Sequence, residues 1–238
     1  MIIFWRIVLA HFLTDFTLQT NRIAVWKRNS YMGVIVHSAT FPLLAFIFCI
    51  FDKNLTGINF IENMTSTWWL LPGWVCILLM SFIHFAEDSY RIWSIKESGS
   101  PDNLIFFLWD QFIHLVTIFV LSPINSSILI PEKYVILLIL IILITHFSTI
   151  FIYYLEQLFY GKENVETRLK GKYAAIAERL IIFGCFLLPG HFVFIGLGLY
   201  AIIRIFIYKP AFKFSYINIA SGTLLAILLG YLSRVILY

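Results

Sequence analysis

Charged residues are scarce in this sequence, and their scarcity excludes most classes of protein. They make up 13% of the 238 residues, whereas hydrophobic residues make up 61%. Soluble domains carry roughly 25% charged and about 45–50% apolar residues, and a soluble fold of this length could not bury so much apolar surface. A disordered chain and a nucleic-acid-binding protein are excluded on the same ground. We therefore expect an integral membrane protein that lies mostly in lipid.

Cysteine is also scarce. The chain has three cysteines, Cys49, Cys76 and Cys185, each in an apolar stretch and none in a CxxC spacing. This pattern argues against a disulfide framework and against a thiolate metal site, so we interpret all three as small buried hydrophobic residues. The first twenty residues lack a small-residue cleavage site, and we do not expect a signal peptide there.

What the sequence does contain is a series of long apolar segments. A helix needs about 20 mainly apolar residues to cross a bilayer. We predict eight candidate spans, at residues 1–20, 31–51, 68–90, 103–122, 132–159, 173–188, 191–208 and 214–237. The break at Pro189-Gly190 separates two short spans or the halves of one kinked helix, which gives seven to eight spans. The expected fold is an all-α, polytopic transmembrane helix bundle, forming a single integral membrane domain over residues 1–238.

The basic residues between these segments predict the orientation of the chain. With eight spans, eleven Lys and Arg residues lie in loops on one side of the membrane, and three lie on the other side. Loops rich in Lys and Arg stay in the cytoplasm. We therefore expect both termini to lie outside.

Ionisable residues occur inside the apolar segments, where they are costly. A central Asp or Arg costs about 2.5–3.5 kcal/mol on the insertion scale. Three pairs of His and Asp are four residues apart, a spacing that places both side chains on one helix face. The pairs, and a histidine that accompanies them, are His11 with Asp15, His84 with Asp88, Asp110 with His114, and His37. All seven fall in the cytoplasmic third of the predicted spans, so we expect one polar site between the helices.

These residue types point to metal binding. Imidazole and carboxylate are the ligands expected for zinc, manganese or iron, and helical bundles build such sites from facing helices. The seven residues exceed the ligands of one structural zinc, so we expect them to bind one or two divalent ions. Arg179 and Arg204 are the candidate substrate-binding residues, because guanidinium suits a phosphate. Gln19, Gln111 and Glu178 are the candidate catalytic residues that orient water or ligands.

The combination predicts an intramembrane metal-dependent hydrolase that acts on a phosphate ester or lipid-like substrate at the cytoplasmic side of the membrane. Its partners would be membrane lipid and a lipid or phosphorylated small molecule. Two other functions use the same residue types and stay open. One is a metal-ion or proton transporter or channel; the other is a non-catalytic membrane sensor or assembly protein with a structural metal site. The polar residues could also form a structural network between helices, with an ion pair between Glu178 and Arg179.

Several motifs carry a family resemblance. They are AHxxxDFxLQ from Ala10 to Gln19, HxxxD at His84 and Asp88, DQxxH from Asp110 to His114, GKxxxxxER from Gly171 to Arg179, and GTLL from Gly222 to Leu225. With these motifs the chain resembles a bacterial membrane-protein family known as domain of unknown function 3307. The resemblance implies the bacterial cytoplasmic (inner) membrane. More loosely, the intramembrane His and Asp are similar to those of membrane-bound metal-dependent hydrolases of bacteria.

Overall fold

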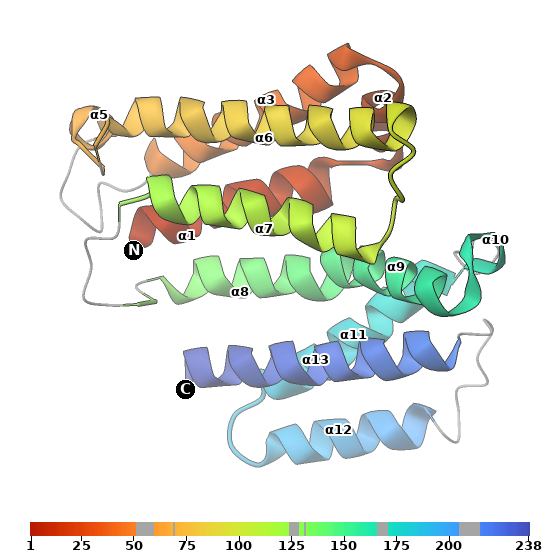
Figure 1. Ribbon diagram of the computed structural model, residues 1–238. Helices are drawn as coiled ribbons and strands as arrows, with labels where there is room; N and C mark the ends of the chain where they lie inside the picture. Colours follow the sequence, from red (N-terminus) through yellow and green to blue (C-terminus); the bar gives the residue numbers. More distant parts are fainter. Residues whose placement is uncertain (51–59, 69, 124–128, 131, 166–170, 205–214) are drawn as a thin grey trace. The chain divides into compact units, whose positions relative to one another are not determined.

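The computed structural model describes residues 1–50, 60–68, 70–123, 129–130, 132–165, 171–204 and 215–238 (Figure 1). Within these ranges the structure is built of helices, and the one strand-like feature is an isolated β-bridge between Thr67 and Pro72. The all-α prediction is therefore confirmed. Parts of the expected spans, at residues 51, 69, 205–208 and 214, lie outside the described residues.

The helices follow the apolar segments of the sequence. In chain order they are α1 Ile2–Phe12, η1 Leu13–Leu18, α2 Asn21–Asn29, α3 Tyr31–Ile50, α5 Phe60–Thr65, α6 Gly73–Glu97, α7 Leu104–Leu121, α8 Lys133–Ile142, η2 Leu143–Phe147, α9 Ser148–Tyr160, α10 Lys162–Val165, α11 Lys172–Phe186, α12 Phe192–Ile202 and α13 Tyr216–Leu237. The segments η1 and η2 are π-helical turns, a rare form found mostly as single turns inside α-helices.

Four of the described helices are long and apolar enough to cross a membrane. They are α3, α7, α13 and the continuous helix from Lys133 to Tyr160. A fifth candidate is the bent pair formed by residues Ile2–Leu18 and Asn21–Asn29. Helix α11 has 15 residues and α12 has 11, which is short of the roughly 20 that a span needs. The structure thus supports an integral membrane protein with four to five candidate spans. The expected number of seven to eight spans stays a prediction.

The described helices fall into two compact units, Met1–Ile139 and Leu140–Tyr238. The long helix made of α8, η2 and α9 passes from the first unit to the second between Ile139 and Leu140. The expectation of a single integral membrane domain stays a prediction.

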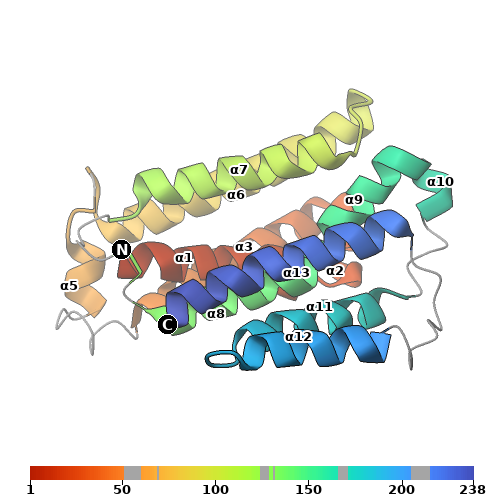
Figure 2. The ribbon, with the colours of Figure 1, turned by 90° about the horizontal axis from the view of Figure 1, so that it is seen from below.

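Unit 1 is a four-helix bundle. Helix α1 contacts α3 and α7, and helix α6 contacts the same two neighbours, so the four helices form a closed ring. Figures 1 and 2 show the four helices running alongside one another, with the chain reversing direction at each step. The apolar core of the bundle includes Ile7, Phe41, Ile77 and Met80, which are all almost completely buried. A ring of this kind directs one side-chain stripe of each helix toward a shared axis.

Helix α2 leaves this bundle at a sharp bend. Its axis is turned by 91° from that of α1 and η1. Thr20 caps the new helix, because its hydroxyl accepts a hydrogen bond from the Ile23 amide at 3.4 Å. None of the residues of α2 is buried. Helix α3 returns so close to α2 that a Cβ at Gly33 would lie 2.5 Å from the Trp26 carbonyl carbon.

We therefore expect Gly33→Ala to destabilise unit 1. The added methyl group would meet backbone atoms of α2, which cannot move aside as a flexible side chain would, so the cost should be about 1–3 kcal/mol. Unfolding of the purified protein in mixed detergent micelles would measure it. Gly184→Ala is the matched control, because nothing lies within 4 Å of a Cβ at Gly184. An unchanged unfolding midpoint for Gly33→Ala would contradict the close approach of the two helices.

Unit 2 is built around α13, which contacts α9 and α11, while α11 also contacts α12 and η2. The break at Pro189-Gly190 is a turn, because α11 and α12 contact each other on either side of it. Arg234 of α13 stabilises this turn, because it donates hydrogen bonds to the carbonyl oxygens of Leu188 at 2.6 Å and Gly190 at 2.9 Å. Gly190 has a φ of +53°, a left-handed conformation that favours glycine.

Candidate metal centre

The polar residues predicted from the sequence gather on the axis of the unit 1 bundle. Helix α1 and the η1 turn supply His11 and Asp15, α3 supplies His37, α6 supplies His84 and Asp88, and α7 supplies Asp110 and His114. Their exposed fractions range from 0% to 6%. All four helices of the ring therefore place ionisable groups in one buried region. Such groups are costly to bury unless they are paired, hydrogen-bonded or coordinated to a metal.

Four donor atoms form a ring of close contacts. His37 Nε2 lies 3.4 Å from both Asp15 Oδ1 and Asp88 Oδ2, and His84 Nε2 lies 3.4 Å and 3.6 Å from the same two oxygens. None of these four atoms has a hydrogen-bond partner. His37, His84 and Asp88 each offer one ligand atom within 4.8 Å of the other two, and zinc binds imidazole nitrogens and carboxylate oxygens at about 2.0–2.2 Å. These three residues therefore fit the ligand set of a divalent ion, and Asp15 Oδ1 lies beside the two histidines.

A second donor group adjoins the first. His11, Asp15, His84 and His114 each offer one ligand atom, and these atoms all lie within 4.8 Å of one another. The Nδ1 atoms of His11 and His114 are 3.8 Å and 3.9 Å from Asp15 Oδ2. Asp15 thus directs one oxygen toward each group and is the natural bridge between them. His84 also belongs to both groups, so the two can share ligands but do not have independent full sets.

Gln111 fixes the orientation of His11. Its amide nitrogen donates to Asp15 Oδ2 at 3.0 Å and to Asp110 Oδ2 at 3.1 Å, so its carbonyl oxygen faces His11 Nε2 at 3.3 Å. A carbonyl oxygen only accepts hydrogen bonds, so Nε2 must carry the proton. The Nδ1 atom of His11 then has a free lone pair and no hydrogen-bond partner. Metal-binding histidines are commonly oriented in this way through their other ring nitrogen.

Aromatic rings enclose the centre. The His84 and His114 rings stack with their centroids 4.3 Å apart. The Phe41 ring also stacks on His84, with the centroids 5.6 Å apart. Phe41 is 1% exposed. These contacts hold the imidazole rings in place and surround the donor atoms with apolar groups.

Asp110 and Gln19 occupy the edge of the cluster. Asp110 belongs to neither donor group, and its Oδ2 accepts hydrogen bonds from Gln111 and from Arg91 Nη1, the latter at 3.1 Å. Its Oδ1 is buried without a hydrogen-bond partner. Gln19 Oε1 accepts a hydrogen bond from Lys27 Nζ at 3.2 Å. The structure therefore brings six of the seven predicted ligands into the two donor groups and leaves Asp110 beside them.

Two cations of the site were not among the sequence candidates. Lys27 Nζ donates to Asp88 Oδ1 at 2.5 Å, and Arg91 contacts Asp110. Both belong to the eleven Lys and Arg residues of the loops that the sequence predicts to be cytoplasmic. Arg91 could have been found, because it follows Asp88 by three residues and so lies on the same helix face. No sequence spacing relates Lys27 to Asp88, because the two residues meet only through the bend of the chain before α2.

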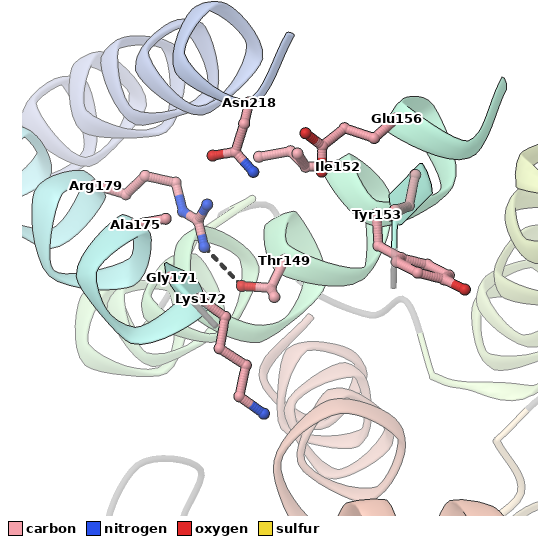
Figure 3. Close-up of a pocket in the computed structure, with 10 residues that line it drawn as sticks. Thr149, Ile152, Tyr153, Glu156, Gly171, Lys172, Ala175, Arg179 and Asn218 are labelled. Atoms are coloured by element: carbon pink, nitrogen blue, oxygen red, sulfur yellow. Dashed lines mark hydrogen bonds between the residues drawn. The ribbon is translucent and has the colours of Figure 1, made fainter. Parts of the chain in front are cut away.

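Glu178, Arg179 and Arg204 belong to unit 2. Arg179 Nε donates to the Ile144 carbonyl oxygen at 2.9 Å, and its Nη2 donates to Thr149 Oγ1 at 2.6 Å (Figure 3). Glu178 forms an ion pair with Arg204 at 3.2 Å. The alternative pair between Glu178 and Arg179 is not the one formed, because consecutive residues of a helix do not face each other.

Arg179 also lines a small pocket of unit 2, with a volume of about 30 Å³. Figure 3 shows Thr149, Glu156, Lys172 and Asn218 around it. Glu156 accepts a hydrogen bond from the Ser215 hydroxyl. A volume of this size holds about one water molecule, so the pocket as it stands is too small for a lipid headgroup.

Comparisons with known proteins agree with the family resemblance. No curated protein and no solved structure matches the chain. Residues 3–137 match the family model described as Protein of unknown function (DUF3307). This match spans nearly all of unit 1 and contains every predicted metal ligand, whereas the later motifs lie beyond it. Because the match covers more than half of the sequence, the chain belongs to the DUF3307 family.

Proposed function

We propose that this protein is an intramembrane metal-dependent hydrolase whose metal centre lies in the unit 1 bundle. Its substrate would be a phosphate ester or a lipid-like ester that reaches the centre from the cytoplasmic side of the membrane. The metal would be zinc, manganese or iron, as one or two ions. Membrane lipid, or a phosphorylated small molecule, would be the partner.

One observation carries this proposal. Asp15 Oδ1, Asp88 Oδ2, His37 Nε2 and His84 Nε2 are buried and lack hydrogen-bond partners, and each of the two oxygens lies 3.4–3.6 Å from each of the two nitrogens. Buried polar atoms without a partner cost about 1–3 kcal/mol each. A divalent ion would satisfy these carboxylate oxygens and imidazole nitrogens together. Metal binding therefore explains why η1, α3 and α6 hold these atoms close to one another.

The surrounding residues have defined roles in this proposal. A bound divalent ion would supply a Lewis acid and would lower the pKa of water toward neutrality. His37, His84, Asp15 and Asp88 would hold the ion, and His11 and His114 could hold a second one through Asp15. Gln111 would keep Asp15 and His11 in their orientations through its hydrogen bonds. Asp110, whose buried Oδ1 lacks a hydrogen-bond partner, would be the proton acceptor during hydrolysis.

The membrane arrangement belongs to the same proposal. We propose that α6, α11 and α12 also cross or enter the bilayer, giving seven to eight spans in the bacterial inner membrane with both termini outside. The excess of Lys and Arg in the loops of one side supports this orientation. A C-terminal reporter that is active only in the cytoplasm would contradict the eight-span version.

Metal analysis tests the centre directly. The purified protein, dialysed against zinc or manganese, should retain about one or two ions per chain. Replacing His84 by Ala together with Asp88 by Asn should remove stoichiometric metal, because both residues belong to the donor group with His37 and His84 belongs to both groups. His191→Ala is the matched control, since His191 is exposed and lies outside both groups. Stoichiometric metal in the double variant would refute the assignment.

A structural metal site without catalysis is the second candidate. The burial of all seven residues favours it, because a catalytic ion keeps one position open to substrate whereas a structural site is closed. The two candidates differ in the effect of Asp110→Asn. For a hydrolase this change should abolish turnover of a phosphate or carboxylic ester while the metal content is retained. For a structural site, no ester substrate would be turned over by the wild-type protein.

A further inference from the structure

Lys27 and Arg91 form a pair of cations on the edge of the candidate metal centre, and the proposed metal ligands do not account for both. Lys27 comes from α2 and its side chain is 14% exposed; Arg91 comes from α6 and is 16% exposed. Each therefore has access both to the buried cluster and to the outside. Asp88, the partner of Lys27, precedes Arg91 by about one helical turn. Lys27 therefore contacts the face of α6 from which Arg91 projects.

Their hydrogen bonds connect them to the carboxylates of the cluster. Lys27 Nζ donates to Asp88 Oδ1 at 2.5 Å, on the opposite side of that carboxylate from the atom that faces His37 and His84. Arg91 Nη1 donates to Asp110 Oδ2 at 3.1 Å, while its Nη2 donates to Asp102 Oδ1, also at 3.1 Å. Lys27 is thus joined to the donor atoms through Asp88, and Arg91 is joined to them through Asp110 and Gln111.

Charge balance gives these two residues a further role. Asp15, Glu87, Asp88, Asp102 and Asp110 carry five negative charges, and Lys27, Arg28 and Arg91 carry three positive charges. One divalent ion would balance these groups, and two ions would leave two positive charges in excess. Uncompensated charge in a region of low dielectric constant is costly. A centre loaded with two ions therefore attracts an anion.

We propose that Lys27 and Arg91 form a subsite for the phosphate group of the substrate, beside the metal centre. The inference rests on the proposed function, since it takes a metal-loaded centre as its starting point. Ammonium and guanidinium groups are the side chains that bind phosphate oxygens with charge-assisted hydrogen bonds. The phosphate can come from a water-soluble phosphate or from a lipid headgroup, because α2 is exposed along its length, including Trp26 and Val25.

Relaxation of phosphorus by bound manganese tests this subsite. The detergent-solubilised wild-type protein, loaded with Mn²⁺, should enhance the ³¹P relaxation of added inorganic phosphate, because the two would be neighbours. Lys27→Met and Arg91→Met should each weaken phosphate binding roughly 10- to 100-fold while the bound Mn²⁺, counted by electron paramagnetic resonance, is retained. Lys27→Arg and Arg91→Lys should keep most of the affinity, since they preserve the charge.

Arg28→Met is the matched control. Arg28 follows Lys27 on α2, but its side chain is 63% exposed and its ion pair with Asp102 lies outside the donor groups. Phosphate binding should change less than about threefold. A second arm replaces inorganic phosphate with phosphatidic acid in nanodiscs, and the arm with the stronger relaxation enhancement identifies the source of the phosphate.

Each failure has a distinct meaning. Manganese bound to the wild-type protein without ³¹P enhancement in either arm would overturn the subsite and leave the metal centre standing. Loss of Mn²⁺ from both Lys27→Met and Arg91→Met would overturn it as well, since the cations would then serve only to hold the ligands. A wild-type protein that binds no metal would refute the proposed function, and the subsite with it.

Discussion

Asp15→Asn should remove metal from the protein without unfolding it. Asp15 lies within 3.4–3.9 Å of ring nitrogens of His11, His37, His84 and His114, so it is the one ligand common to all four histidines. An amide keeps the shape of the carboxylate but loses its charge. Structural zinc sites bind with about 10–16 kcal/mol over four ligands. Losing one ligand should therefore weaken binding on the order of 100- to 1,000-fold.

Metal titration with a competing chelator would measure this change. Glu87→Gln is the matched control, because it removes a negative charge next to Asp88 but lies outside both donor groups. The titration also separates a metal centre from a structural polar network. In a network, Asp15→Asn would lower the unfolding midpoint of metal-free protein and leave metal content unchanged. That pair of results would contradict the metal centre.

Arg179→Met should destabilise unit 2 by about 2–4 kcal/mol. The π-helical turn η2 changes the backbone hydrogen-bonding pattern of the long helix, and Arg179 donates to the Ile144 carbonyl oxygen in that turn. It also donates to the Thr149 hydroxyl, which in turn donates to the Thr145 carbonyl oxygen at 2.6 Å. Methionine supplies none of these donors, so the hydrogen bonds of Arg179 to Ile144 and Thr149 would be lost.

Unfolding in mixed detergent micelles would measure this loss, with Arg179→Lys as the comparison. Lysine keeps the charge but is a single donor centre, so it should recover only part of the stability. Metal content should be unchanged in both variants, because the donor groups lie in unit 1. If Arg179 instead serves mainly to bind substrate, as the sequence suggests, Arg179→Met would leave the unfolding midpoint unaltered.

Much of the candidate site could be predicted from spacing alone. A separation of four residues places His84 with Asp88 on one face of α6, as in any α-helix. His11 and Asp15 have the same spacing, and their side chains lie 3.8 Å apart across the start of the π-helical turn η1. Ionisable side chains in apolar helices must also find one another, because isolated they are costly. These two rules are enough to gather the six residues of the donor groups. They do not decide which oxygen or nitrogen atom faces the centre.

The positions of the cations could not be predicted in the same way. Lys27 reaches Asp88 because the chain bends by 91° after η1 and α3 approaches α2 at Gly33. Glu178 meets Arg204 because α11 and α12 lie against each other beyond the turn at Gly190. Both contacts join residues that are distant in sequence, and no local periodicity encodes them.

The sequence by itself determined that this is an all-helical membrane protein with a layer of His and Asp among its apolar segments. Composition and helical periodicity are local properties, and they survive any arrangement of the helices. The tertiary structure decided that α1, α3, α6 and α7 close into a ring around those residues. It also decided that Lys27 and Arg91 flank them, while Arg179 holds a π-helical turn. Those outcomes depend on which helix faces meet, and that is set by packing between distant parts of the chain.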